Sequence, residues 1–162
     1  MRKKRKYEFT GEEDRCYSCT FRRIRALRDF GDVKKGDLGG WIESESNLSH
    51  EGNCWVYENC YVSGRKAKIY GNAKIKGNSS VEDSEVHGNA VFDGRVRVFS
   101  GCNIKDNVVL HSNATLQESY VADNVEISGY VWLTGCIVAG NTKLTGDKPW
   151  YEYDHKFLVD KC

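Results

Sequence analysis

Two histidines and one cysteine pair are the residues of this sequence whose types and spacing could do chemistry. His87 and His111 each follow an apolar residue, and an imidazole that titrates near neutrality can act as the general base of an acyl transfer. Cys16 and Cys19 have the spacing of a zinc-ligand pair, but a structural zinc site needs four ligands and no second pair is near in the sequence. Whether these side chains can form a site depends on the strands and turns that position them.

A six-residue repeat runs through most of the chain. From Val56 to Leu144 an apolar residue recurs every five to seven positions, and a smaller residue lies two positions before each. Positions i and i+2 of a strand share a face, so each repeat places one small and one larger side chain inward. Gly-Asn pairs such as Gly71-Asn72 and Gly88-Asn89 fall between repeats and tolerate the positive φ of a sharp corner. The pattern predicts an all-β protein, a single-stranded parallel β-helix of about five triangular coils.

Four of the seven cysteines occupy the small inward position of this repeat. Elsewhere that position holds Ala, Ser or Val, so we expect these residues to be buried thiols that act as small hydrophobic groups; they are Cys54, Cys60, Cys102 and Cys136. An odd cysteine count without a signal peptide argues against a disulfide framework.

The repeats resemble those of a known family. Hexapeptides such as "YGNAKI", "HGNAVF" and "SNATLQ" are similar to those of left-handed β-helix proteins, and the stretch "ALRDFGDVKKGDLGGWIESESNLSHEGNCWVYENC" resembles the N-terminal segment of YdcK-like β-helix proteins. The resemblance implies a left-handed coil. It also implies a short member of a group that is frequent in bacteria and in their phages and prophages.

The two ends do not follow the repeat, and we expect them to cap it. An uncovered end of a β-helix invites strand addition, so a cap is needed at each end. We predict a basic arm and β-hairpin cap over residues 1–40, with strands within 6–10 and 19–30, the β-helix over 41–146, and a short capping tail over 147–162. All three belong to one structural domain.

Positive charge is concentrated near the N-terminus. Residues 1–35 hold 12 Lys or Arg against 6 acidic residues, although the net charge of the whole chain is only +1. A basic patch of this kind can attract nucleic acid or another acidic surface. No base-stacking or groove-reading element accompanies it, so nucleic-acid binding is not favoured. The patch residues are Arg2, Lys3, Lys4, Arg5, Lys6, Arg22, Arg23, Arg25 and Arg28.

Several large apolar residues fall at outward positions of the predicted strands. Outward positions of a solvated strand should be polar, and apolar groups there usually mark an interface unless a cap covers them. These candidates, with the neighbouring arginine, are Trp55, Tyr57, Tyr61, Arg97, Phe99, Tyr120, Trp132 and Ile137. They predict a protein partner or a homo-oligomer, either a dimer or a trimer.

Two functions remain open on the sequence. The preferred one is a non-catalytic β-helix that binds protein, and the resemblance implies a phage or prophage accessory protein that inhibits a host defence factor. The alternative is a small hexapeptide-repeat acyltransferase with an acyl-CoA donor, although the projecting loop and C-terminal helix usual in such enzymes are missing. We expect no cofactor and no membrane span, because no apolar run approaches 18 residues, and we expect a location in the bacterial cytoplasm.

Overall fold

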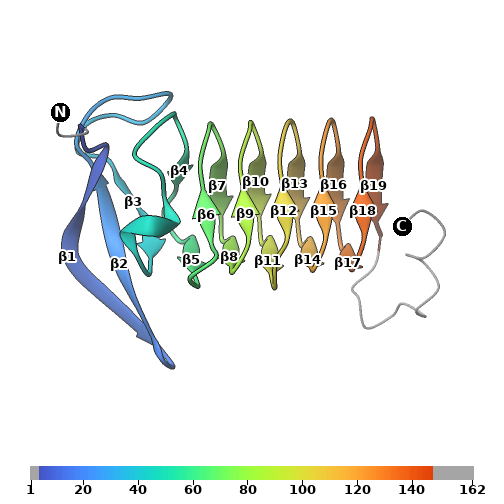
Figure 1. The fold of residues 1–162 in the computed structure, drawn as a ribbon, viewed down its shortest axis with the longest axis horizontal. Coiled ribbons are helices and arrows are strands. Elements are labelled where there is room, and N and C mark those ends of the chain that lie inside the picture. The colour runs from blue at the N-terminus through green and yellow to red at the C-terminus, as the bar shows by residue number, and fades with distance from the viewer. Residues whose placement is uncertain (1–3, 148–162) are drawn as a thin grey trace.

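The protein folds as a β-helix whose coils run through three sheets (Figure 1). Within the coils the strands of each sheet are parallel. The structure is a computed structural model and describes residues 4–147, so the predicted capping tail lies outside the described residues apart from its first residue. Each coil passes through the sheets in turn, and the stack is left-handed, as the resemblance implied. Six strands stack in one of the sheets, so the helix has about six coils rather than five.

The sheets have eight, six and five strands. The eight-stranded sheet contains β1 (Tyr7–Cys16), β2 (Cys19–Ala26), β3 (Leu38–Ile42), β5 (Tyr61–Ser63), β8 (Ser80–Glu82), β11 (Arg97–Phe99), β14 (Thr115–Gln117) and β17 (Trp132–Thr134). The six-stranded sheet contains β4 (Trp55–Val56), β7 (Lys74–Gly77), β10 (Val91–Gly94), β13 (Val109–Ser112), β16 (Glu126–Gly129) and β19 (Lys143–Gly146). The five-stranded sheet contains β6 (Lys68–Ile69), β9 (Glu85–Val86), β12 (Asn103–Ile104), β15 (Tyr120–Val121) and β18 (Ile137–Val138).

A β-hairpin covers the N-terminal end of the helix, as predicted. β1 pairs antiparallel with β2, and β2 pairs antiparallel with β3, which then joins the parallel stack through β5. The first strand is longer than expected because it continues through the charged segment to Cys16, leaving a turn of only two residues. One short helix, η1 (Glu45–Asn47), follows β3 and is the only helix of residues 4–147; it is too short and too polar to cross a bilayer.

The core is the set of inward side chains that the repeat predicts. Every predicted inward position from Cys54 to Val138 is buried, whereas Thr142 and Leu144 in the last described coil are half-buried. Cys54, Cys60 and Cys102 are free thiols, as expected. Cys136 is equally buried but is disulfide-bonded, so the prediction of reduced thiols is wrong at that position.

One corner of the triangle is held by a ladder of asparagine side chains. The Nδ2 of each asparagine donates to the Oδ1 of its counterpart in the next coil, over 2.8 to 3.0 Å. The residue before each asparagine has positive φ, which confirms the prediction that Gly-Asn pairs form corners. The ladder runs through Asn72, Asn89, Asn107, Asn124 and Asn141.

The buried thiol of Cys60 predicts a loss of stability at alkaline pH. Burial raises its pKa from 9.0 to about 11, so between these values the folded chain keeps a proton that the unfolded chain has lost. Its contribution to the free energy of unfolding is therefore complete below pH 9, falls as the pH rises, and is lost above pH 11. Two pKa units correspond to about 3 kcal/mol.

Urea titrations of the wild type and of Cys60→Ala at pH 8 and pH 11 would measure this. Ala occupies the equivalent inward position at Ala114, so the variant should fold and should lose less stability between the two pH values than the wild type. Cys16→Ala, at the exposed hairpin tip, is the control for removing a thiol. Equal losses in the wild type and Cys60→Ala would refute the prediction.

Candidate interaction surface

The two histidines lie on different sheets and do not form a site together. His87 directly follows β9, is half-buried, and stacks on Tyr70 with 4.4 Å between ring centroids and 6° between planes. His111 lies in β13 of the six-stranded sheet, where it pairs in register with Asp93. Within the part of the chain that the structure describes, neither imidazole ring is hydrogen-bonded to a carboxylate that would orient it as a base. Their geometry gives no support to acyl transfer.

Cys16 and Cys19 face each other across the turn of the hairpin. They are register partners at the end of β1 and β2, and both are free. Among residues 4–147 no group of three or more His, Cys, Asp and Glu side chains is arranged to hold a metal ion. The described residues give the pair no further ligands.

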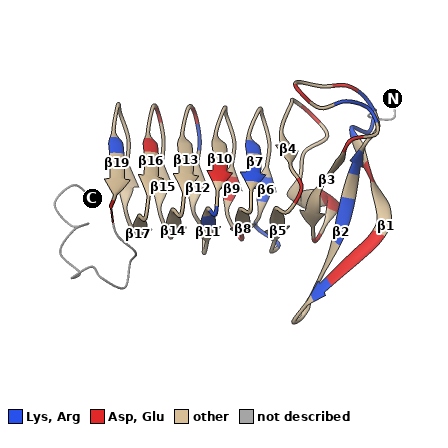
Figure 2. Ribbon diagram, turned by 180° about the vertical axis from the view of Figure 1, so that it is seen from behind, with Lys and Arg blue, Asp and Glu red and all other residues tan. Residues whose placement is uncertain are grey.

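The basic cluster does not form a continuous positive surface. Figure 2 shows the acidic residues of β1 beside the basic residues of β2. Arg25 forms an ion pair with Glu8, and Arg23 forms ion pairs with Glu12 at 3.3 Å and Glu58 at 3.0 Å. Much of the predicted patch is therefore neutralised by neighbouring acidic residues. Arg2 and Lys3 lie outside the described residues, and Lys4 and Arg5 are exposed.

The prediction that Lys6 belongs to a basic surface is wrong, because its side chain is fully buried. Its Nζ donates to the main-chain oxygen of Cys54 at 2.8 Å, with the oxygens of Glu51 and Gly52 at 3.4 and 3.5 Å. These carbonyls lie at the start of the first coil, where no earlier coil supplies donors. Burial lowers the pKa of Lys6, and the neighbouring Cys54 acts in the opposite direction. The ammonium thus closes the N-terminal end of the helix.

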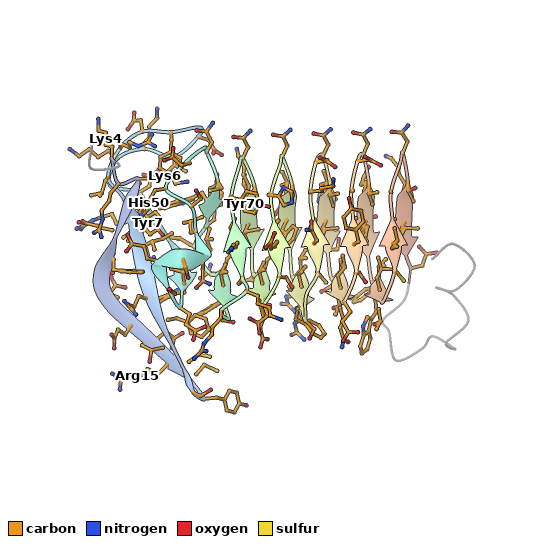
Figure 3. All side chains as sticks on the ribbon, in the orientation of Figure 1. Lys4, Lys6, Tyr7, Arg15, His50 and Tyr70 are labelled. Atoms are coloured by element: carbon orange, nitrogen blue, oxygen red, sulfur yellow. The ribbon has the colours of Figure 1, made fainter. Side chains whose placement is uncertain are left out.

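Aromatic side chains complete this closure around Lys6. Tyr7 donates to the main-chain oxygen of Leu48 at 2.8 Å and stacks on His50, and Figure 3 shows Lys6, Tyr7 and His50 gathered at this end. Trp55, predicted to face outward, is only 1% exposed because Tyr7 and Phe30 pack against its ring. It belongs to the core of the cap and not to an interface.

Tyr57, another interface candidate, is occupied by the loop between β2 and β3. Its hydroxyl donates to Asp32 at 2.7 Å, and Lys74 forms an ion pair with the same carboxylate at 2.9 Å. These contacts lower the pKa of Asp32 to about 2, chiefly through the tyrosine hydrogen bond. Burial, together with this hydrogen bond, raises the pKa of Tyr57. Tyr57 therefore anchors the loop to the six-stranded sheet.

The candidates on the five-stranded sheet are more dispersed. Lys105 lies over the ring of Tyr120, with 5.6 Å from its Nζ to the ring centroid. Ile137, in β18 of this sheet, is 67% exposed.

The remaining candidates lie on the solvent side of the eight-stranded sheet, which we call the outer face. Strand register places one column of side chains along it, one from each strand from β2 to β17. In order these are Arg23, Trp41, Tyr61, Ser80, Arg97, Thr115 and Trp132. Phe99 lies beside Arg97 on the same strand and face.

The N-terminal half of this column is preorganised. The rings of Trp41 and Tyr61 stack with 9° between planes, and Phe21 meets Tyr61 edge-on at 5.1 Å. The guanidinium of Arg23 lies over Trp41, and Asp14 accepts a hydrogen bond of 2.8 Å from the Tyr61 hydroxyl. Burial, followed by this hydrogen bond, raises the pKa of Tyr61.

The sequence pattern predicts Tyr61 at an outward position of this face but does not indicate Trp41 and Phe21. Both precede the regular repeat, and Phe21 comes from an antiparallel strand that the repeat cannot place. Trp41 could have been found by extending the repeat one coil toward the N-terminus, because it occupies the outward position equivalent to that of Tyr61.

The comparisons with known proteins agree with the fold and leave the chemistry open. An alignment over 84 residues, which covers 46% of this chain, shows 40% identity to a protein of Escherichia coli K12 named uncharacterized acetyltransferase YdcK. The aligned part covers 26% of that protein, so the similarity extends over about a quarter of its length. No family model matches the chain.

Proposed function

We propose that this protein acts by binding another protein through the outer face and performs no catalysis. The observation that carries the proposal is the aromatic and arginine column, in which stacked Trp41 and Tyr61 are followed by the exposed side chains of Arg97 and Trp132. Trp, Tyr and Arg are the residues enriched where protein interfaces concentrate their binding energy. A flat, rigid sheet that presents them loses little conformational entropy on binding.

The more specific form of the proposal concerns the biological role. The resemblance to short β-helix proteins of phages and prophages supports an accessory protein that binds and inhibits a host factor. Such a role requires a surface for protein binding.

Capture from the native host would test the proposal. We expect the wild-type chain to retain a specific protein that is lost, or reduced at least about tenfold, with Trp132→Asp. Ile137→Asp is the matched control, because it also places a charge on an exposed apolar side chain but on the five-stranded sheet. Loss of the captured protein with Ile137→Asp, and not with Trp132→Asp, would reject the outer face as the binding surface.

Acyl transfer is the second candidate, and the name of the Escherichia coli relative is the observation that favours it. If the chain binds an acyl donor as an isolated protein, acetyl-CoA at 100 times its dissociation constant should stabilise the fold by about 2.7 kcal/mol. We expect no shift in the thermal midpoint. A clear shift that His87→Ala or His111→Ala removes would favour the enzyme over the binding protein.

A further inference from the structure

Large and small side chains alternate along the outer face from β5 to β14. The column passes from Tyr61 to Ser80, Arg97 and Thr115, so each small hydroxyl residue lies between two large neighbours. Strands in a sheet are about 4.8 Å apart, so the large groups stand about 9.6 Å apart and a side chain about as thick as an aromatic ring fits between them. The face therefore presents projections and gaps with the same spacing.

A surface with this spacing is complementary to itself. Two copies can bring the same face together through a twofold axis that lies in the plane of the interface. If this axis is parallel to the strands, the coils of the partner run in the opposite order. Each column of side chains then still faces the same column of the partner. When that axis lies between β8 and β11, Arg97 meets the partner's Ser80. In the same register Tyr61 meets the partner's Thr115, so each large side chain from β5 to β14 is set opposite a small one, and Trp41 meets the partner's Trp132 at each end of the overlap.

Charge complementarity favours the same register. Glu82 follows Ser80 by two residues and shares its face, so Arg97 of one copy lies within reach of the partner's Glu82. Both side chains are exposed, and neither takes part in an ion pair within residues 4–147. The twofold axis repeats the contact, which gives two Arg97 to Glu82 pairs flanking the axis.

We propose that the outer face binds a second copy of this chain, with the two β-helices antiparallel and the axis between β8 and β11. The inference rests on the proposed binding role of this face and places a second copy of the chain, in place of a host factor, on the same surface. Strands β3 to β17 offer six strands of overlap, which buries on the order of 1,000 Å² in total. An interface of this size is near the lower limit for a specific complex, so the dimer forms with a dissociation constant on the order of micromolar.

Sedimentation velocity of the full chain over a range of concentrations tests the proposal. The wild type should pass from monomer to dimer as concentration rises. Glu82→Arg and Arg97→Glu should each raise the dissociation constant at least about tenfold, because each places like charges together. The variant that combines Glu82→Arg with Arg97→Glu should recover dimerisation, because it again places opposite charges together at both contacts, with the two signs exchanged.

Asp93→Arg is the matched control, since it reverses an exposed acidic charge on β10 of the six-stranded sheet and should leave the dimer unchanged. Circular dichroism of every variant confirms that the β-helix is folded. A wild type that stays monomeric, a trimer, or a dimer unaffected by both single variants would overturn the antiparallel arrangement. A monomeric wild type whose capture of a host protein still depends on Trp132 would overturn this inference while leaving the proposed function in place.

Discussion

Lys6→Glu should destabilise the protein by more than about 4 kcal/mol or prevent the cap from folding. The side chain at this position is fully buried, and the main-chain oxygens of Glu51, Gly52 and Cys54 are directed at its terminal group. A carboxylate at this position would be a buried charge without a partner, and it could not donate a hydrogen bond to any of the three carbonyl oxygens. The variant therefore carries both an unpaired buried charge and unsatisfied main-chain acceptors. Large effects of this size arise from such defects and seldom from surface charge.

Urea unfolding followed by tryptophan fluorescence measures this, because Trp55 packs in the same cap. Lys4→Glu is the matched control: it makes the same exchange two residues earlier at an exposed position and should change stability by less than about 0.5 kcal/mol. Lys6→Met keeps the apolar stem and removes only the donors, so its loss should be intermediate, about 2 kcal/mol. Equal stability of Lys6→Glu and Lys4→Glu would show that the ammonium does not close the helix.

Gly77→Ala should cost about 3 kcal/mol, although it adds a single methyl group. Gly77 has φ of 75°, and a Cβ there would lie 2.5 Å from the oxygen and 2.6 Å from the nitrogen of Gly94 in the next coil. An alanine in the left-handed region costs about 1 kcal/mol by itself. The remainder comes from pushing apart two coils whose corners stack backbone on backbone.

Gly135→Ala separates these two contributions. Gly135 has a similar φ of 64°, but an added Cβ would meet nothing within 4 Å. It should therefore lose only the conformational part, about 1 kcal/mol. Thermal or urea unfolding of both variants gives the difference, and two equal losses would contradict the idea that coil contact limits this corner.

The coils could be predicted from the sequence because their physical signal repeats. Each inward pair recurs at nearly constant spacing, and a strand one residue out of register would place polar groups in the core. Ala73 and Ile75, for example, are buried by the same geometry that buries Ala90 and Phe92 one coil later. The Gly-Asn corners are equally regular, since each corner needs a positive φ.

The cap could not be predicted in the same way, because its contacts occur once. Lys6 lies within a run of basic residues. Nothing in the sequence of that run shows that the ammonium group of Lys6 is buried against three carbonyl oxygens while the other basic side chains are solvated. Trp55 has the outward position that the repeat assigns, but the hairpin covers it. In the same way, the sequence does not show that the acidic residues of β1 lie beside the arginines of β2 and form ion pairs with them.

The asparagine ladder has a consequence for how the length of this protein can change. Successive ladder residues such as Asn72 and Asn89 are 17 positions apart and are each followed by alanine. Deleting residues 73–89 would therefore join Asn72 to Ala90 and recreate the local sequence of a normal corner. A deletion of six or twelve residues would leave one amide without its neighbour and move every later strand to another sheet. Insertions and deletions are thus tolerated in units of a whole coil, so related chains should differ in length by multiples of 17 or 18 residues within the helix.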